Sequence, residues 1–182
     1  HYPLRRQRQM CIRDREQRAG SGGTMGGIHY GMSASAEKLF VGVSDLPTNN
    51  PYNIGPAHPG IHALSLSTGE VLWRNDLPNQ CEEGPFLCWP GISAAVSSTT
   101  DLVFAGGLDG ILRAFDTDDG SILWETNTRQ SFGLRNGIQA TGGSIESDGP
   151  VIVNGQVFIT SGYEKWGEAP GNVVLVYSLN GE

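Results

Sequence analysis

The chain has 182 residues, and its 12 lysines and arginines stand against 19 aspartates and glutamates, which gives a net charge of −7. Such an acidic chain argues against nucleic acid as a partner. No run of 18 apolar residues occurs, so we expect no membrane span, and the 26 glycines suit a fold with many tight turns.

Residues 1–18 differ from the rest of the chain. They carry six arginines and two acidic residues, a net charge of +4, and show neither strand alternation nor a helical stripe. One interpretation is a basic arm for nucleic acid or anionic lipid. We favour the other, a disordered or non-native segment, because the remainder carries −11. The folded domain is then expected to span residues 19–182.

The first predicted unit follows this segment. Apolar runs at residues 27–33 and 38–43 predict two strands, and the stretch from Ala63 to Trp73 predicts two more, joined at a Thr68-Gly69 turn. Val, Ile, Phe and Leu are enriched and no apolar period of 3.6 residues is sustained, which favours strands over helices.

The second unit repeats the first 51 positions later. The pattern A-x-[SD]-x-x-x-G-x-x-x-W begins at Ala63 and again at Ala114, after apolar runs at residues 91–97 and 102–106. A period near 50 residues with four strands per unit is typical of the blades of a β-propeller. We expect Trp73 and Trp124 to pack as a structural seam between blades rather than to bind substrate.

The third unit comprises residues 143–147, 156–160 and 172–181, and the sequence stops before its fourth strand. The prediction is therefore an all-β fold of about three four-stranded propeller blades. Because propellers close with about four to eight blades, we expect the chain to be a fragment of a longer protein, with open blade sides when alone.

Connection lengths differ between the two faces of the predicted propeller. The turns between the first and second strands and between the third and fourth strands are short and share one face. The other connections lie on the opposite face and are mostly long, at residues 44–59, 77–90, 127–142 and 162–170. Although long loops can simply vary freely, their clustering on one rim predicts a functional site there.

Candidate site residues lie in or beside these loops. Asp45 and Asp109 follow second strands, although Asp109-Gly110 suits an ordinary hairpin turn better. His29 lies at the channel end of a first strand, where we take Ser93 and Ser144 as its counterparts; a structural role is an equal alternative for His29. The remaining cofactor-binding candidates are Arg129, Arg135, Asn136 and Tyr163.

Cys81 and Cys88 are separated by six residues, which does not match the short spacing of a zinc knuckle, and no histidine lies nearby. We favour a disulfide that staples the loop, and hence an oxidising compartment, over two free thiols. No Cys-x-x-Cys-His motif occurs, so this stretch attaches no c-type haem.

The repeated motif resembles the tryptophan-docking motif of quinoprotein dehydrogenases, whose propellers bind pyrroloquinoline quinone (PQQ). It matches well at Ala114, Asp116, Gly120 and Trp124, whereas Ser65 replaces aspartate in the first copy. Longer strings at residues 26–32, 90–96, 104–110, 161–163 and 170–175 look like those of polyvinyl-alcohol dehydrogenases, a resemblance that covers about residues 19–182.

This resemblance implies a periplasmic enzyme with seven or eight blades and a haem c domain upstream. It implies oxidation of a secondary alcohol, polymeric or small, to a ketone with electrons passing to cytochrome c, and PQQ with Ca²⁺ as cofactors. PQQ is a tricarboxylate, so Arg129 and Arg135 could meet its acids, although a solvated loop is an equal alternative. Asp45 and Asp109 become candidates for the catalytic base or a calcium ligand. The alternative function is a non-catalytic propeller that serves as an interaction scaffold.

Overall fold

The structure, a computed structural model, describes residues 14–23, 25–46, 51, 53–133, 137–162 and 164–179. Within these residues the fold is all-β, with strands β1 to β13 and no helix. Accordingly, the described part of the chain contains no helix that could cross a membrane.

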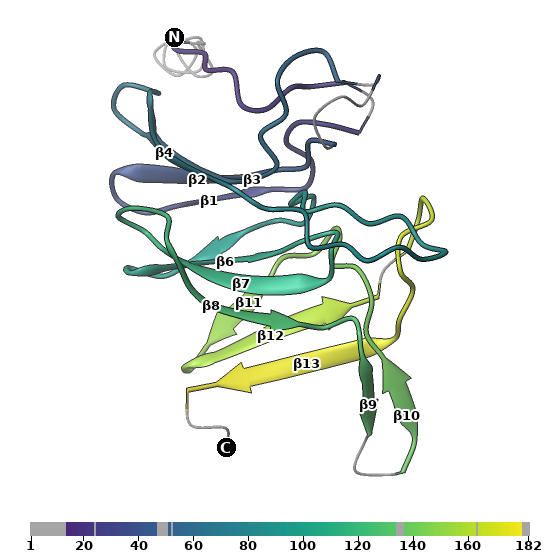
Figure 1. The fold of residues 1–182 in the computed structure, drawn as a ribbon. Helices are drawn as coiled ribbons and strands as arrows, with labels where there is room; N and C mark the ends of the chain where they lie inside the picture. Colours follow the sequence, from purple (N-terminus) through teal and green to yellow (C-terminus); the bar gives the residue numbers. More distant parts are fainter. Residues whose placement is uncertain are drawn as a thin grey trace, which may run out of the picture.

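Eleven of the strands form three antiparallel sheets that follow one another along the chain and stack in that order (Figure 1). The first sheet holds β1 (Met32–Ala34), β2 (Lys38–Val43), β3 (Gly60–Ser65) and β4 (Val71–Asp76). The second holds β5 (Ser97–Ser98), β6 (Leu102–Gly106), β7 (Ile111–Asp116) and β8 (Ile122–Asn127). The third holds β11 (Val151–Val153), β12 (Gln156–Ser161) and β13 (Val173–Ser178). Each sheet keeps its strands in chain order, so the expected blades are confirmed.

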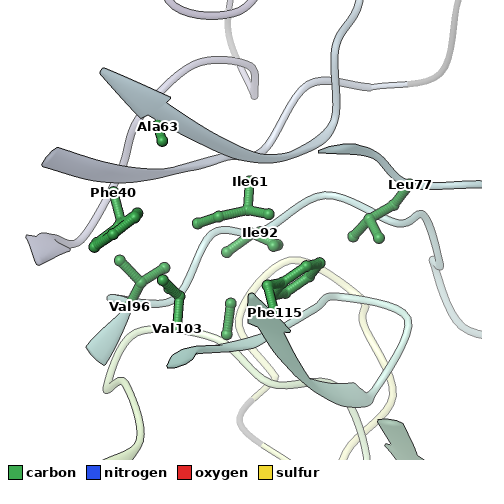
Figure 2. Packing of buried hydrophobic residues seen from close by; sticks show 9 residues of the cluster. Phe40, Ile61, Ala63, Leu77, Ile92, Val96, Val103 and Phe115 are labelled. Atoms are coloured by element: carbon green, nitrogen blue, oxygen red, sulfur yellow. The ribbon is translucent and has the colours of Figure 1, made fainter. Parts of the chain in front are cut away.

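The core lies between the sheets. Phe40, Ile61 and Ala63 of the first sheet face Val103 and Phe115 of the second, and all five are fully buried (Figure 2). A second cluster, built around Leu112 and Ile159, joins the second sheet to the third. Because side chains alternate in direction along a strand, β6 and β7 of the second sheet contribute to the core on both faces.

The tryptophan seam is confirmed at Trp73. Trp73 lies opposite Ala63 in the β3–β4 register, and it packs against the core between the first two sheets. Its ring lies over Gly120, a turn residue of the second sheet with φ +74°, where an added Cβ would overlap the indole. Glycine is therefore required at this turn both by its backbone and by the neighbouring sheet.

The long connections lie at the end of the sheets opposite the short turns (Figure 1), as the connection lengths predict. One connection holds more structure than expected. Residues 127–142 contain the hairpin of β9 (Ser131–Gly133) and β10 (Gln139–Thr141). Three-residue strands give too weak an alternation to be recognised in sequence, and the Asn136-Gly137 pair between them was the available hairpin signal.

The innermost strands begin later in the chain than predicted. β1 and β5 overlap only the ends of the predicted runs at residues 27–33 and 91–97, and the prediction of a strand at residues 143–147 is wrong, because β11 begins at Val151. Before β1 and β5, the chain runs between sheets rather than within one. Tyr30 donates its backbone N–H to Ser93 O, Ile92 donates to Val43 O and Ala95 donates to Ser147 O. These contacts stitch neighbouring sheets together and place the segments around His29, Ser93 and Glu146 side by side.

Of the N-terminal segment, residues 14–18 are described, and they form neither helix nor strand. Arg15 donates to the backbone carbonyl of Leu66 at 3.0 Å, so this part of the segment contacts the first sheet.

Candidate functional site

A cavity of about 280 Å³ lies on the face that carries the long connections, where segments from all three sheets converge. Met25, Trp89 and Leu108 form its apolar floor, and the indole N–H of Trp89 donates a hydrogen bond to Ser44 O at 3.3 Å. Trp166 stands at the mouth with 63% of its surface exposed. The cavity thus combines a rigid indole floor with an open aromatic edge.

Three side chains from successive sheets form a hydrogen-bonded chain along the cavity. His29 Nδ1 lies 2.9 Å from Ser93 Oγ, and Ser93 Oγ donates to Glu146 Oε1 at 3.2 Å. The prediction that His29 and Ser93 share a position is thereby supported by direct contact.

The third member of this chain is Glu146, not the expected Ser144. Ile92 donates its backbone N–H to the carbonyl of Val43 at the end of β2. Ile145 makes the corresponding bond to the carbonyl of Gly107, just after β6. Ile92 and Ile145 are therefore equivalent in the repeat, and so are the residues that follow them, Ser93 and Glu146. Ser144 is buried behind the cavity and donates to Leu108 O. Ser144 corresponds to Gly91 instead, so the prediction of Ser144 as a counterpart of Ser93 is wrong by two positions.

Glu146 is the unusual group of this cavity. It is only 6% exposed, and its Oε2 and the hydroxyl of Ser44 are buried atoms without a hydrogen-bond partner. Burial raises the pKa of the Glu146 carboxyl above its ordinary value, and the nearby Glu168 carboxylate raises it further, while the hydrogen bond from Ser93 lowers it. Two unpartnered polar atoms that face one cavity indicate a place for a polar ligand.

Glu168 faces the same cavity from the β12–β13 connection. It is 1% exposed, and its Oε2 accepts backbone N–H groups from Trp166 at 2.8 Å and Lys165 at 3.4 Å. Neither Glu146 nor Glu168 was singled out from the sequence. Glu146 precedes β11 and Glu168 lies within the long connection between β12 and β13, so their proximity becomes apparent only when the repeat register is known.

Asp45, a predicted base, has a structural environment. It is fully buried after β2, and its two oxygens accept backbone N–H groups from Ser21, Gly27 and His58 at 2.6 to 2.9 Å. A carboxylate that holds three loop amides is committed to those bonds. Its catalytic role stays a prediction that this geometry does not favour.

Asp109 is also occupied. In the β6–β7 turn it accepts the backbone N–H of Ile111 at 3.0 Å and pairs with Arg113, whose Nη2 lies 2.6 Å from Asp109 Oδ2. Arg113 is fully buried and also reaches Glu125 at 3.3 Å. The turn interpretation of Asp109-Gly110 agrees with this arrangement.

The other predicted binding residues are only partly described. Arg129 lies at the predicted face, where its Nη1 donates to Cys88 Sγ at 3.0 Å. Cys81 and Cys88 form the expected disulfide, with Cα atoms 5.8 Å apart. Arg135, Asn136 and Tyr163 lie outside the described residues.

Metal-binding capacity is limited in the described part of the chain. No group of three or more His, Cys, Asp or Glu residues there is arranged to hold a metal ion. Glu146 and Glu168 could supply two oxygen ligands to a hard cation such as Ca²⁺, and further ligands would have to come from elsewhere.

Comparison with known proteins agrees with this architecture. The family model described as outer membrane protein assembly factor BamB (PQQ_2) matches residues 25–136. The chain is 36% identical over 176 residues to a polyvinylalcohol dehydrogenase of Pseudomonas sp., and 33% identical over 179 residues to one of Sphingopyxis sp. strain 113P3. These alignments cover 91% and 92% of this chain and 27% of each relative, so the chain spans about a quarter of their length.

A solved structure, the quinohemoprotein alcohol dehydrogenase ADHIIG of Pseudomonas putida HK5, superposes with a TM-score of 0.52 at 20% identity, over 79% of this chain and 18% of that one. That likeness establishes the shared fold, a β-propeller. The chain therefore belongs to the PQQ_2 repeat family, and it is similar over nearly its whole length to polyvinylalcohol dehydrogenases.

Proposed function

We propose that this chain forms part of a PQQ-dependent alcohol dehydrogenase that oxidises secondary alcohols of the polyvinyl-alcohol type to ketones. The observation that carries this proposal is the cavity with Glu146 Oε2 and Ser44 Oγ unpartnered, at the point where three repeats converge. The similarity to polyvinylalcohol dehydrogenases supports the reaction class. Cytochrome c as electron acceptor and a periplasmic location are proposed from the same resemblance.

The described cavity fits PQQ in part. Its indoles, Trp89 and Trp166, offer flat surfaces for a planar ring, and Glu146 and Glu168 offer oxygens for a bound Ca²⁺. No lysine or arginine lines it in the described residues, so the three carboxylates of PQQ need cations from beyond this lining. Arg129 lies near the cavity, because it contacts Cys88, which precedes Trp89 in the chain. Arg135 remains a proposed source of a second cation for the PQQ carboxylates.

The protein's own contribution follows from the unpartnered carboxylate. When bound, PQQ would supply the hydride acceptor. Glu146 Oε2 would accept the hydroxyl proton of the alcohol, and a raised pKa makes a carboxylate a stronger base than it is in water. Ser93 and His29 would hold the other oxygen of Glu146 in place.

The test is reduction of cytochrome c by the full-length protein supplied with PQQ, Ca²⁺ and a secondary alcohol. Replacing Glu146 by Gln should lower kcat by about 10²- to 10⁴-fold, the usual contribution of a general base. Glu37→Gln, at an exposed position in the turn between β1 and β2, is the matched control and should leave the rate unchanged. Full activity in the Glu146→Gln protein would remove the base assignment, and failure of the wild type to take up PQQ would remove the proposed function.

A second candidate function is a non-catalytic scaffold, favoured by the description of the matching family as an assembly factor. For a scaffold, the cavity carboxylates have no reacting partner, so Glu146→Gln and Glu168→Gln would change stability but no catalytic rate.

A further inference from the structure

One wall of the cavity is tied to the disulfide loop rather than to a sheet. The backbone N–H of Leu87 donates to the carbonyl of Gly167 at 2.8 Å, and Leu87 pairs with Glu168 as an isolated parallel bridge. Leu87 is followed directly by Cys88, which is bonded to Cys81. The disulfide therefore closes a short loop whose last residues hold the Glu168 segment.

The residue on the other side of Cys88 also belongs to the cavity. Trp89 is 4% exposed and forms the apolar floor, and its indole bonds to Ser44 O. Cys88 thus lies between the residue that fastens Glu168 and the residue that forms the floor. The guanidinium of Arg129 lies 3.0 Å from Cys88 Sγ and so contacts the disulfide itself.

Little else in the described residues holds the wall that contains Glu164–Glu168. Glu164 and Trp166 are exposed, and the hydrogen bonds from Lys165 and Trp166 to Glu168, and from Gly167 to Glu164, stay within the segment. Both ends of the segment are linked to Ser144, which lies between β10 and β11: Gly162 N donates to Ser144 O, Ala169 N donates to Ser144 Oγ, and Ser144 N donates to Ala169 O. Between these ends, residues 164–168 receive one backbone hydrogen bond from the rest of the described chain, and its donor is Leu87.

We propose that the Cys81–Cys88 disulfide is a redox-sensitive strap that positions Glu168 in the cavity. While the bond is intact, the loop keeps the N–H of Leu87 against Gly167 and the Glu168 carboxylate beside Glu146. Once it is broken, residues 81–88 gain conformational freedom, and this single bond no longer holds the wall. The consequence for alcohol oxidation rests on the proposed function, whereas the strap itself does not.

The reaction is a thiol–disulfide exchange with a small dithiol. Both cysteines are half-buried, so a dithiol can reach them. A dithiol thiolate attacks Cys81 Sγ, the S–S bond breaks, and Cys88 leaves as a thiolate beside the Arg129 guanidinium. The second thiol then resolves the mixed disulfide, so that the dithiol is oxidised by two electrons and both cysteines are reduced.

Hydrogen–deuterium exchange of the full-length protein before and after dithiothreitol treatment tests the strap, in a Cys11→Ser background that removes the third cysteine of this sequence. We expect the amides of Leu87, Lys165, Trp166 and Gly167 to exchange at least about tenfold faster after reduction, and β6 and β7 amides to be unchanged. Reoxidation should restore protection. Unchanged exchange at residues 165–167 in fully reduced protein would overturn the proposal, as would loss of protection throughout the sheets.

A pair of variants isolates the Leu87 contact without reducing the disulfide. Leu87→Pro removes the donor N–H and should release residues 165–167 as reduction does, whereas Leu87→Ala keeps the N–H and should not. Equal release in both variants would contradict the backbone link. These exchange experiments need neither PQQ nor alcohol, so they can succeed even where the assay of the proposed function fails.

Discussion

The indole N–H of Trp73 donates a hydrogen bond to the backbone carbonyl of Thr117 at 3.1 Å, so the last strand of one sheet is fastened to the turn of the next. Asn75 makes a parallel link by donating to Gly120 O at 2.7 Å. Both acceptors belong to the same turn between β7 and β8. The first copy of the repeat motif thus helps to form its own sheet and also attaches that sheet to the following one.

Gly120→Ala should lower the free energy of unfolding by about 2 to 4 kcal/mol, because it combines a strained positive φ with overlap against Trp73. The matched control is Gly155→Ala, which has the same φ of +74° and no atom within 4 Å of an added Cβ. That variant should lose only the backbone part, about 1 kcal/mol. Urea unfolding of both proteins measures the difference, and equal losses would show that the Trp73 contact contributes nothing.

The buried pair of Asp109 and Arg113 should matter for folding more than for chemistry. Asp109→Asn removes the charge that faces a fully buried guanidinium and should lower the free energy of unfolding by about 3 to 5 kcal/mol. Asp118→Asn, in the pair with Lys38 where Asp118 is 89% exposed, should cost at most about 1 kcal/mol. Urea unfolding again provides the measurement. A stable Asp109→Asn protein with no alcohol oxidation would instead restore Asp109 as a candidate base.

Much of this architecture can be predicted from sequence, because the repeat is local. Apolar runs, the Thr68-Gly69 turn and the spacing to Trp73 determine strands and register within one unit. The site is different, since it is assembled by the segments that cross between units. Asp45 and Asp109 have the residue type and loop position of catalytic groups, yet backbone amides and Arg113 occupy them. Glu146 becomes recognisable only when the contact of Ile145 with Gly107 shows its register.

The electrostatic coupling between Glu146 and Glu168 gives a prediction for the titration of the cavity. Glu168→Gln removes the neighbouring negative charge, so it should lower the pKa of Glu146 toward its ordinary value of 4.5, while burial keeps it above that value. Carbon-13 carboxyl shifts followed over pH report this directly. Glu37→Gln, an exposed charge in the turn between β1 and β2, should leave the titration of Glu146 unchanged; a shift as large in that control would assign the effect to overall charge.

The same raised pKa predicts how stability changes with pH. Between 4.5 and the raised value, the folded protein binds the Glu146 proton more tightly than the unfolded chain does, so this group's contribution to stability falls as pH rises through that window. Glu146→Gln abolishes this fall and should make the protein more stable than wild type at neutral pH. Thermal unfolding at several pH values between 4 and 8 distinguishes the two curves. Identical pH profiles would mean that Glu146 titrates alike in both states.

His62 should make stability depend on pH in the direction opposite to that of Glu146, so that stability is lost as pH falls. Its ring is fully buried in β3 and its Nδ1 has no partner; burial lowers the pKa of the imidazole below its ordinary 6.5, although Asp76 opposes the shift. The unfolded chain therefore takes up the proton first, and stability is lost as pH falls from 6.5 through the lowered pKa. His62→Leu should flatten this loss. His58→Gln is the control, since His58 is partly exposed and bonded to Asp76 Oδ2 at 2.8 Å. If that variant flattens the profile and His62→Leu does not, the acid sensitivity belongs to the exposed pair and the buried ring is a passive core residue.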